Sequence, residues 1–132
     1  MFTNLNHSGF ERPTVGRLRT GLKILFGLAV IVITHESLIP VNESSVPNNW
    51  DKLVHFLAYF ILTGLSVFAF PKARLLGLFA LMTVLGGGIE IAQELMNVGR
   101  DGTWGDGLAN MGGAAAPIIM WVLFRRPRSG QT

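Results

Sequence analysis

The sequence contains no cysteine in its 132 residues. Disulfide bonds, thiolate metal sites, iron–sulfur clusters and cysteine nucleophiles are therefore excluded. Charged residues are also scarce, at 14% of the chain, against about 25% in ordinary soluble domains. Hydrophobic residues make up 49%, and the mean hydropathy is +0.43. This composition argues against a disordered chain and against a typical soluble enzyme.

The apolar residues gather in four long segments. A helix needs about 17–25 mostly apolar residues to span a membrane. Four segments have about that length, at residues 22–39, 53–70, 75–95 and 107–124. They are too long for strands, and their apolar residues do not alternate with polar ones as in a membrane barrel. The sequence therefore predicts an all-α fold, an integral membrane four-helix bundle.

The basic residues indicate how such a bundle would be oriented. The net charge is +3, and most of the eleven Lys and Arg residues lie before the first apolar segment, between the second and third, or after the last. Because cytoplasmic loops carry an excess of Lys and Arg, we expect the N and C termini to be cytoplasmic. The predicted organisation is a basic arm over residues 1–20, a four-helix domain over residues 21–124 and a basic tail over residues 125–132.

Polar residues within the apolar segments fall near the ends that we expect to face outward. Asp51 and His55 are four residues apart, as are Asp106 and Asn110, so each pair shares one helical face. Glu90 interrupts the third segment, where a bare carboxylate is costly. With a rise of about 1.5 Å per residue, these groups lie within about two turns of the outer surface. We therefore predict one polar pocket, built from Asp51, His55, Glu90, Gln93, Arg100, Asp106 and Asn110.

These residue types suit acid/base chemistry and ligand binding. The candidate catalytic residues are Asp51 and His55, which have the form of an oriented base, and Glu90, which suits a general acid. Helix capping is an equally good interpretation of Asp51, which begins an apolar segment, and of Asp106. The sequence lacks the HxxE and HExxH spacings of common metal sites, so we expect no metal ion and no cofactor. The candidate ligand-binding residues are Lys52, Gln93, Arg100, Asp106 and Asn110.

Four functions fit this pattern. A recognition site near the outer surface would hold an anionic headgroup, a lipid-linked wall precursor or part of a glycopeptide, with Arg100 contacting two oxygens at once. A membrane enzyme would hydrolyse or transfer a group on a lipid-linked envelope substrate. A proton-coupled carrier or a purely structural bundle would use the same residues differently, although carrier sites lie nearer the membrane midplane. Nucleic-acid binding is not expected, because the basic residues flank apolar segments and have no aromatic stacking platform.

A longer series of spaced residues carries a family resemblance. It runs Asp51-Lys52-x-x-His55-Phe56-x-x-Tyr59, then Glu90-x-x-Gln93, then Arg100-x-x-Thr103-x-x-Asp106-x-x-x-Asn110-x-x-Gly113. In this series the chain resembles the VanZ-like family. The resemblance implies a small multi-pass protein of the bacterial cytoplasmic membrane and a link to low-level resistance to the glycopeptide teicoplanin. The implied partners are membrane lipid and either a lipid-linked cell-wall precursor or the glycopeptide itself.

Overall fold

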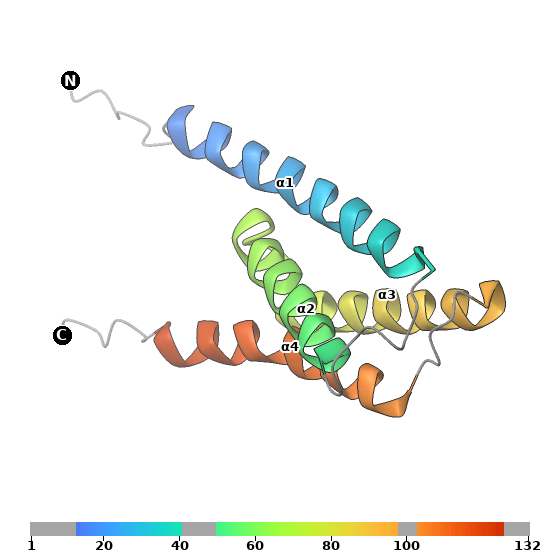
Figure 1. Cartoon of the computed structure of the whole chain (residues 1–132). Coiled ribbons are helices and arrows are strands. Elements are labelled where there is room, and N and C mark those ends of the chain that lie inside the picture. The colour runs from blue at the N-terminus through green and yellow to red at the C-terminus, as the bar shows by residue number, and fades with distance from the viewer. Residues whose placement is uncertain (1–12, 41–49, 98–102, 126–132) are drawn as a thin grey trace, which may run out of the picture.

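The computed structural model describes residues 13–40, 50–97 and 103–125. This part of the chain forms four α-helices, which are α1 (Pro13–Leu38), α2 (Trp50–Ala69), α3 (Leu75–Met96) and α4 (Trp104–Phe124) (Figure 1). All four are long and apolar enough to cross a membrane. The prediction of an all-α fold with four helices of this kind is therefore confirmed.

The first helix begins earlier than the hydropathy predicted. It starts at Pro13, not near residue 22, so part of the segment that we interpreted as a basic arm is helical. Pro is well suited to the first turn of a helix, where its missing N–H has no partner to lose. The arginines and leucine that follow are good helix formers. Hydropathy detects only where the apolar run begins. The helix itself extends further toward the N-terminus, because the residues before the apolar run also favour helix.

The second helix lies at the centre of the bundle. Its most extensive interface is with α4, and α1 and α3 also pack against it. The buried residues of α2 follow one face, because His55, Tyr59, Leu62 and Ser66 are separated by three or four positions. The apolar core joins Tyr59 and Leu62 to Met82 of α3 and Ala114 of α4.

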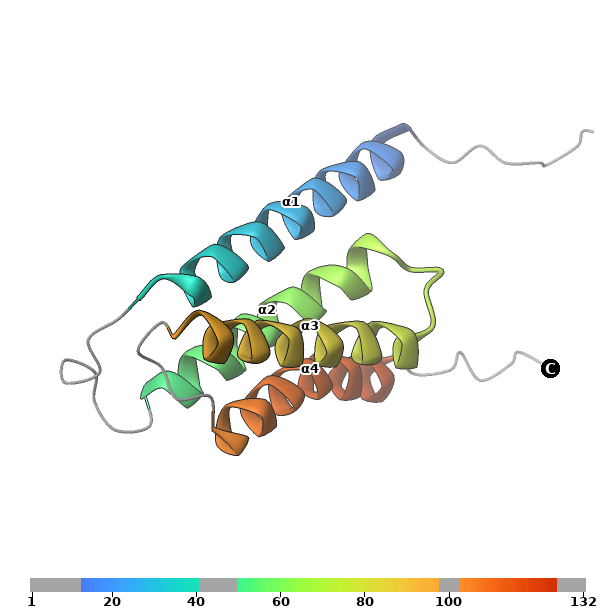
Figure 2. The same ribbon diagram turned by 90° about the vertical axis from the view of Figure 1, so that its right-hand side faces the viewer.

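Helix α1 is the most weakly embedded of the four. It lies along the outside of the other three helices (Figure 2), and the 18-residue apolar window of this helix contains no buried residue. Its side chains contribute only partly buried contacts to the core, among them Phe26, Val30 and Ile33. The larger buried surfaces therefore belong to α2, α3 and α4, and among the described residues these three helices also carry the buried polar side chains.

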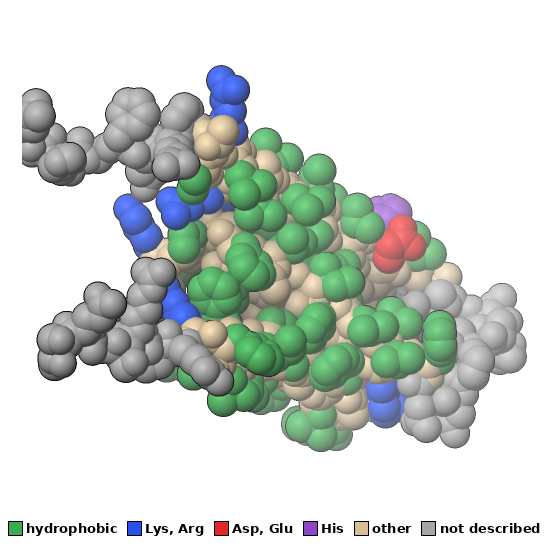
Figure 3. Space-filling model, turned by 90° about the vertical axis from the view of Figure 1, so that its left-hand side faces the viewer, with side chains coloured by type: hydrophobic (Ala, Val, Ile, Leu, Met, Phe, Trp, Pro, Cys, Tyr) green, Lys and Arg blue, Asp and Glu red, His purple; other side chains and the backbone are tan. Residues whose placement is uncertain are grey.

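Charged side chains separate between the two ends of the bundle. The start of α1, the end of α2 and the start of α3 lie at one end, together with the end of α4 (Figures 1 and 2). The Lys and Arg side chains gather at this end in Figure 3, and the visible acidic and histidine side chains lie at the other. Lys52, at the start of α2, is an exception among the described basic residues. We call the second end the polar end, and the predicted site residues that lie there are Asp51, Lys52, His55, Glu90, Gln93, Asp106 and Asn110.

Candidate functional site

Asn110 of α4 joins His55 of α2 to Glu90 of α3. Its amide Nδ2 donates a hydrogen bond to Glu90 Oε1 at 2.8 Å, and its Oδ1 lies 3.1 Å from His55 Nδ1. Because an amide oxygen only accepts hydrogen bonds, His55 Nδ1 is the donor in this pair. The structure therefore brings together three of the predicted site residues, each from a different helix, in one hydrogen-bonded series.

Two members of this series lie where water has little access. His55 and Asn110 are buried, and Glu90 is half-buried. Buried polar groups are costly unless they are hydrogen-bonded, so each member depends on its neighbour. Gly86 of α3 leaves the space that Asn110 occupies, because a Cβ atom at Gly86 would lie 3.1 Å from Asn110 Nδ2. A small residue on α3 is thus part of the reason why the amide reaches the carboxylate.

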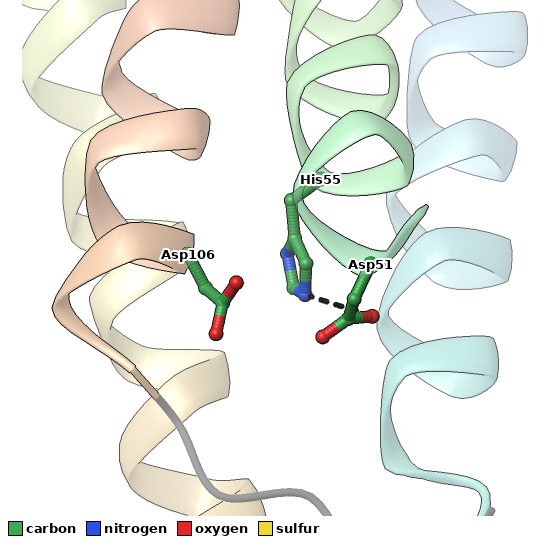
Figure 4. A group of neighbouring side chains, drawn as sticks. All are labelled: Asp51, His55 and Asp106. Carbon is green, nitrogen blue, oxygen red and sulfur yellow. Dashed lines mark ion pairs between the residues drawn. The ribbon is translucent and has the colours of Figure 1, made fainter. Parts of the chain in front are cut away.

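Two aspartates lie on the other side of His55. Asp51 lies one turn before His55 on the same helix, and its Oδ1 is 3.8 Å from His55 Nε2. Asp106 faces them from the first turn of α4 (Figure 4). Its Oδ2 accepts hydrogen bonds from the backbone N–H of Thr103 at 3.0 Å and from the Thr103 hydroxyl at 2.7 Å. This capping box confirms the capping interpretation of Asp106.

Lys52 is the basic side chain beside this group. Its Nζ lies 4.0 Å from Asp106 Oδ1, and its side chain is 44% exposed. The methylene groups of Lys52 run over Gly105, where a Cβ atom would overlap the side chain at 2.6 Å from Cε. The absence of a side chain at Gly105 therefore lets Lys52 reach from α2 to the start of α4.

Gln93 differs from the predicted arrangement. Gln93 is only 2% exposed, and its Nε2 donates a 2.7 Å hydrogen bond to the backbone carbonyl of Ser37. Gln93 thus ties α3 to the end of α1, a contact that the sequence did not indicate. Arg100 lies outside the described residues.

A cleft of about 700 Å³ opens between α3 and α4 beside Glu90. We call it the α3–α4 cleft. Gly107 forms part of its wall, because a Cβ atom there would lie 3.5 Å from Glu90 Oε2. The polar side chains that line it are those of Thr83, Glu90, Glu94, Thr103 and Asn110, and the remaining lining residues are Gly87, Ile91, Trp104, Gly107, Leu108 and Met111.

A second, smaller cavity lies on the opposite side of Asn110. It has a volume of about 110 Å³ and is lined by His55, Tyr59, Glu36 and residues of α1 and α2. Asn110 lines both spaces. The hydrogen-bonded series from His55 to Glu90 therefore runs from one cavity to the other across the core of the polar end.

Thr103, Trp104 and Gly107 line the α3–α4 cleft and were not among the predicted site residues. Thr103 and Asp106 have the spacing of a capping box, a signal that was present in the sequence. No sequence pattern identifies Gly107, because its importance lies in the space that it leaves beside Glu90.

No protein-family model matches the chain, and no match is found among curated proteins or solved structures. The resemblance to the VanZ-like family therefore rests on the spaced residues of the motif.

Proposed function

We propose that this chain is a VanZ-like multi-pass protein of the bacterial cytoplasmic membrane, and that its α3–α4 cleft binds the polar head of an envelope amphiphile. The observation that carries the proposal is the position of Glu90. It is an ionisable side chain in a long apolar helix, and it lines a cleft of about 700 Å³. Ionisable groups at such positions are expensive and are functional by default.

The lining of the cleft favours a ligand that donates hydrogen bonds. Glu90 and Glu94 supply carboxylate oxygens, Thr103 lines the same space, and Trp104 adds an aromatic face. Hydroxyl and ammonium groups donate to carboxylates, and aromatic faces attract ammonium groups. We therefore favour a sugar-bearing or amino-bearing head over the anionic headgroup that the sequence suggested. A lipid-linked cell-wall precursor and a glycopeptide both present such groups.

The remaining walls of the cleft suit an attached apolar chain. Ile91 and Leu108 are exposed apolar residues, and Met111 continues the same face of α4 toward the middle of the helix. An amphiphile that places its head at Glu90 would lay its chain along this face. Such binding would reduce the access of teicoplanin to its target or hold the antibiotic away from it.

The proposed topology predicts a clear labelling pattern. If the polar end faces outward, a single cysteine introduced by Trp104→Cys reacts with an impermeant maleimide in intact cells, because Trp104 is 94% exposed. A cysteine introduced by Lys72→Cys, in the exposed turn after α2, reacts only after the membrane is permeabilised. The chain has no native cysteine to interfere. The reverse pattern would contradict the proposed orientation.

Teicoplanin susceptibility tests the proposed function. We expect expression of the wild-type chain to raise the inhibitory concentration of teicoplanin and Gly107→Leu to abolish the increase, because the leucine side chain fills the cleft beside Glu90. Glu90→Gln is expected to have the same effect, since it removes the negative charge and replaces one of the two acceptor oxygens with a donor NH2 group.

Two control variants match these changes at equal membrane levels of protein. Gly88→Leu adds the same side chain at an exposed position of α3 with open space around it, and we expect it to protect like the wild type. Glu94→Gln alters an exposed carboxylate one turn from Glu90 and is expected to have a smaller effect. Protection by Gly107→Leu equal to that of Gly88→Leu would contradict ligand binding in the cleft.

A second candidate function is acid/base catalysis on the same amphiphile. The hydrogen-bonded series of His55, Asn110 and Glu90 favours it, because such a series orients a general acid next to a bound substrate. Binding and catalysis are distinguished by Glu90→Gln. A catalyst would keep most of its binding and lose turnover, whereas a binding site would lose affinity.

A further inference from the structure

We propose that Asp51, His55 and Asp106 bind a divalent transition-metal cation such as Zn²⁺. One ligand atom of each residue lies within 4.8 Å of a ligand atom of the other two. Figure 4 shows the two carboxylates converging on the imidazole ring from α2 and α4. These two aspartates and a histidine are hard and borderline ligands of the kind that Zn²⁺ and its first-row neighbours accept.

The burial and hydrogen bonding of Asp106 independently support a cation site. Its side chain is 5% exposed, and its Oδ1 is a buried oxygen that receives no hydrogen bond from the described residues. A buried carboxylate oxygen without such a partner is costly. The other oxygen is held by Thr103, so the carboxylate cannot rotate freely. The carboxylate is thus held in the place where it faces His55 and Asp51 (Figure 4), with one oxygen that makes no hydrogen bond to the described residues.

His55 is oriented in the same way. Its Nδ1 donates to Asn110 Oδ1 at 3.1 Å, which leaves the Nε2 lone pair directed toward Asp51 at 3.8 Å. Metal-ligating histidines characteristically donate their other ring N–H to a carbonyl or carboxylate oxygen. Asn110 supplies that oxygen here, and Thr103 performs the equivalent role for Asp106.

The distances require only a small adjustment. Zn²⁺ bonds to nitrogen and oxygen are about 2.0–2.1 Å long, and a tetrahedral site therefore separates its ligand atoms by about 3.4 Å. The Asp51–His55 separation of 3.8 Å is close to that value. The other separations among the three ligand atoms are at most 4.8 Å. Rotation of the Asp51 side chain, which is 42% exposed, can shorten the distance between its oxygen and that of Asp106. Three protein ligands leave a fourth position for water or another group.

Lys52 competes with the cation. Its ammonium lies 4.0 Å from the same Asp106 Oδ1 that would bind the metal. Because its side chain is half-exposed, it can turn outward when a divalent cation enters. Removal of this ammonium takes away a positive charge and is therefore expected to strengthen metal binding.

The metal site does not depend on the function proposed above. None of Asp51, His55 and Asp106 lines the α3–α4 cleft. The measurement also uses metal alone, so its failure leaves amphiphile binding untouched.

Calorimetric titration of the full-length protein in detergent, freed of metal by a chelator, tests the site. We expect the wild type to bind one Zn²⁺ per chain and to unfold at a higher temperature when Zn²⁺ is present. Asp51→Asn keeps the size of the side chain and weakens binding at least 10-fold. Lys52→Met keeps the length of the side chain, removes the ammonium and binds Zn²⁺ more tightly than the wild type.

A control variant removes the other histidine–carboxylate pair at the same end. His35 Nδ1 and Glu36 Oε1 lie 3.4 Å apart and are both exposed, so Glu36→Gln is expected to leave the affinity unchanged. Failure of the wild type to bind Zn²⁺ would overturn the proposal. Equal affinities of the wild type and Asp51→Asn would do the same, as would a loss of affinity in Lys52→Met, which keeps all three ligands.

Discussion

Replacement of Gly113 by alanine is expected to lower the free energy of unfolding by about 3 kcal/mol, near the upper end for overpacking. Gly113 lies where α4 meets the backbone of α2. A Cβ atom there would overlap the carbonyl oxygen of Phe56 and lie 3.0 Å from its carbonyl carbon. A backbone carbonyl cannot swing aside as a side chain would, so the two helices must separate. Because α2 and α4 share an extensive interface, this separation weakens packing along the whole interface and not only at Gly113.

Gly112→Ala is the matched control for this prediction. Its Cβ atom would meet the Phe56 ring at 3.6 Å, an ordinary contact, and alanine favours a helix over glycine by about 1 kcal/mol. Thermal unfolding in detergent, followed by tryptophan fluorescence, should show a clear fall in Tm for Gly113→Ala and little change or a rise for Gly112→Ala. Equal behaviour of the two variants would contradict the close approach of α2 and α4.

The second large effect is expected at Asn110. Asn110→Asp is expected to destabilise the protein by about 2–3 kcal/mol, because it turns the amide that donates to Glu90 into a second carboxylate. Glu90→Gln alone replaces the carboxylate with an amide, whose oxygen is a weaker acceptor for Asn110 Nδ2. When both substitutions are present, the new amide can donate to the new carboxylate, so that the direction of the hydrogen bond is reversed.

A double-mutant cycle measures this reversal. We expect the double variant to be more stable than the sum of the single changes predicts, with a coupling energy of about 1–2 kcal/mol. Chemical unfolding of the wild type, both single variants and the double variant supplies the four values. Simple additivity would show that the 2.8 Å contact between Asn110 and Glu90 makes no energetic contribution.

The sequence predicted the helices well because membrane-length apolar runs leave few alternatives. It also predicted that His55, Glu90 and Asn110 lie at one depth, since depth follows from helix length and rise. It did not predict which groups pair, because pairing depends on how each helix is rotated about its axis. Gln93 illustrates this, since its position beside Glu90 in sequence suggested a shared pocket, whereas its side chain reaches the carbonyl of Ser37.

The candidate metal ligands also show that a sequence does not reveal which side chains meet across different helices. Asp51 and His55 are neighbours on one helix turn, and that pair was visible in the sequence. Asp106 follows more than fifty residues later and joins them only because α4 packs against α2. The expectation of no metal ion was based on local spacing, which carries no information about a ligand supplied by another helix.

Native mass spectrometry of the protein purified from its membrane tests the central claim most directly, that the α3–α4 cleft holds an amphiphile. The measurement compares the wild type with Gly107→Leu and with Gly88→Leu, after gentle removal of detergent. We predict a bound species of defined mass on the wild type and on Gly88→Leu, and its loss from Gly107→Leu. The same bound species on all three proteins, or on none of them, would contradict the claim.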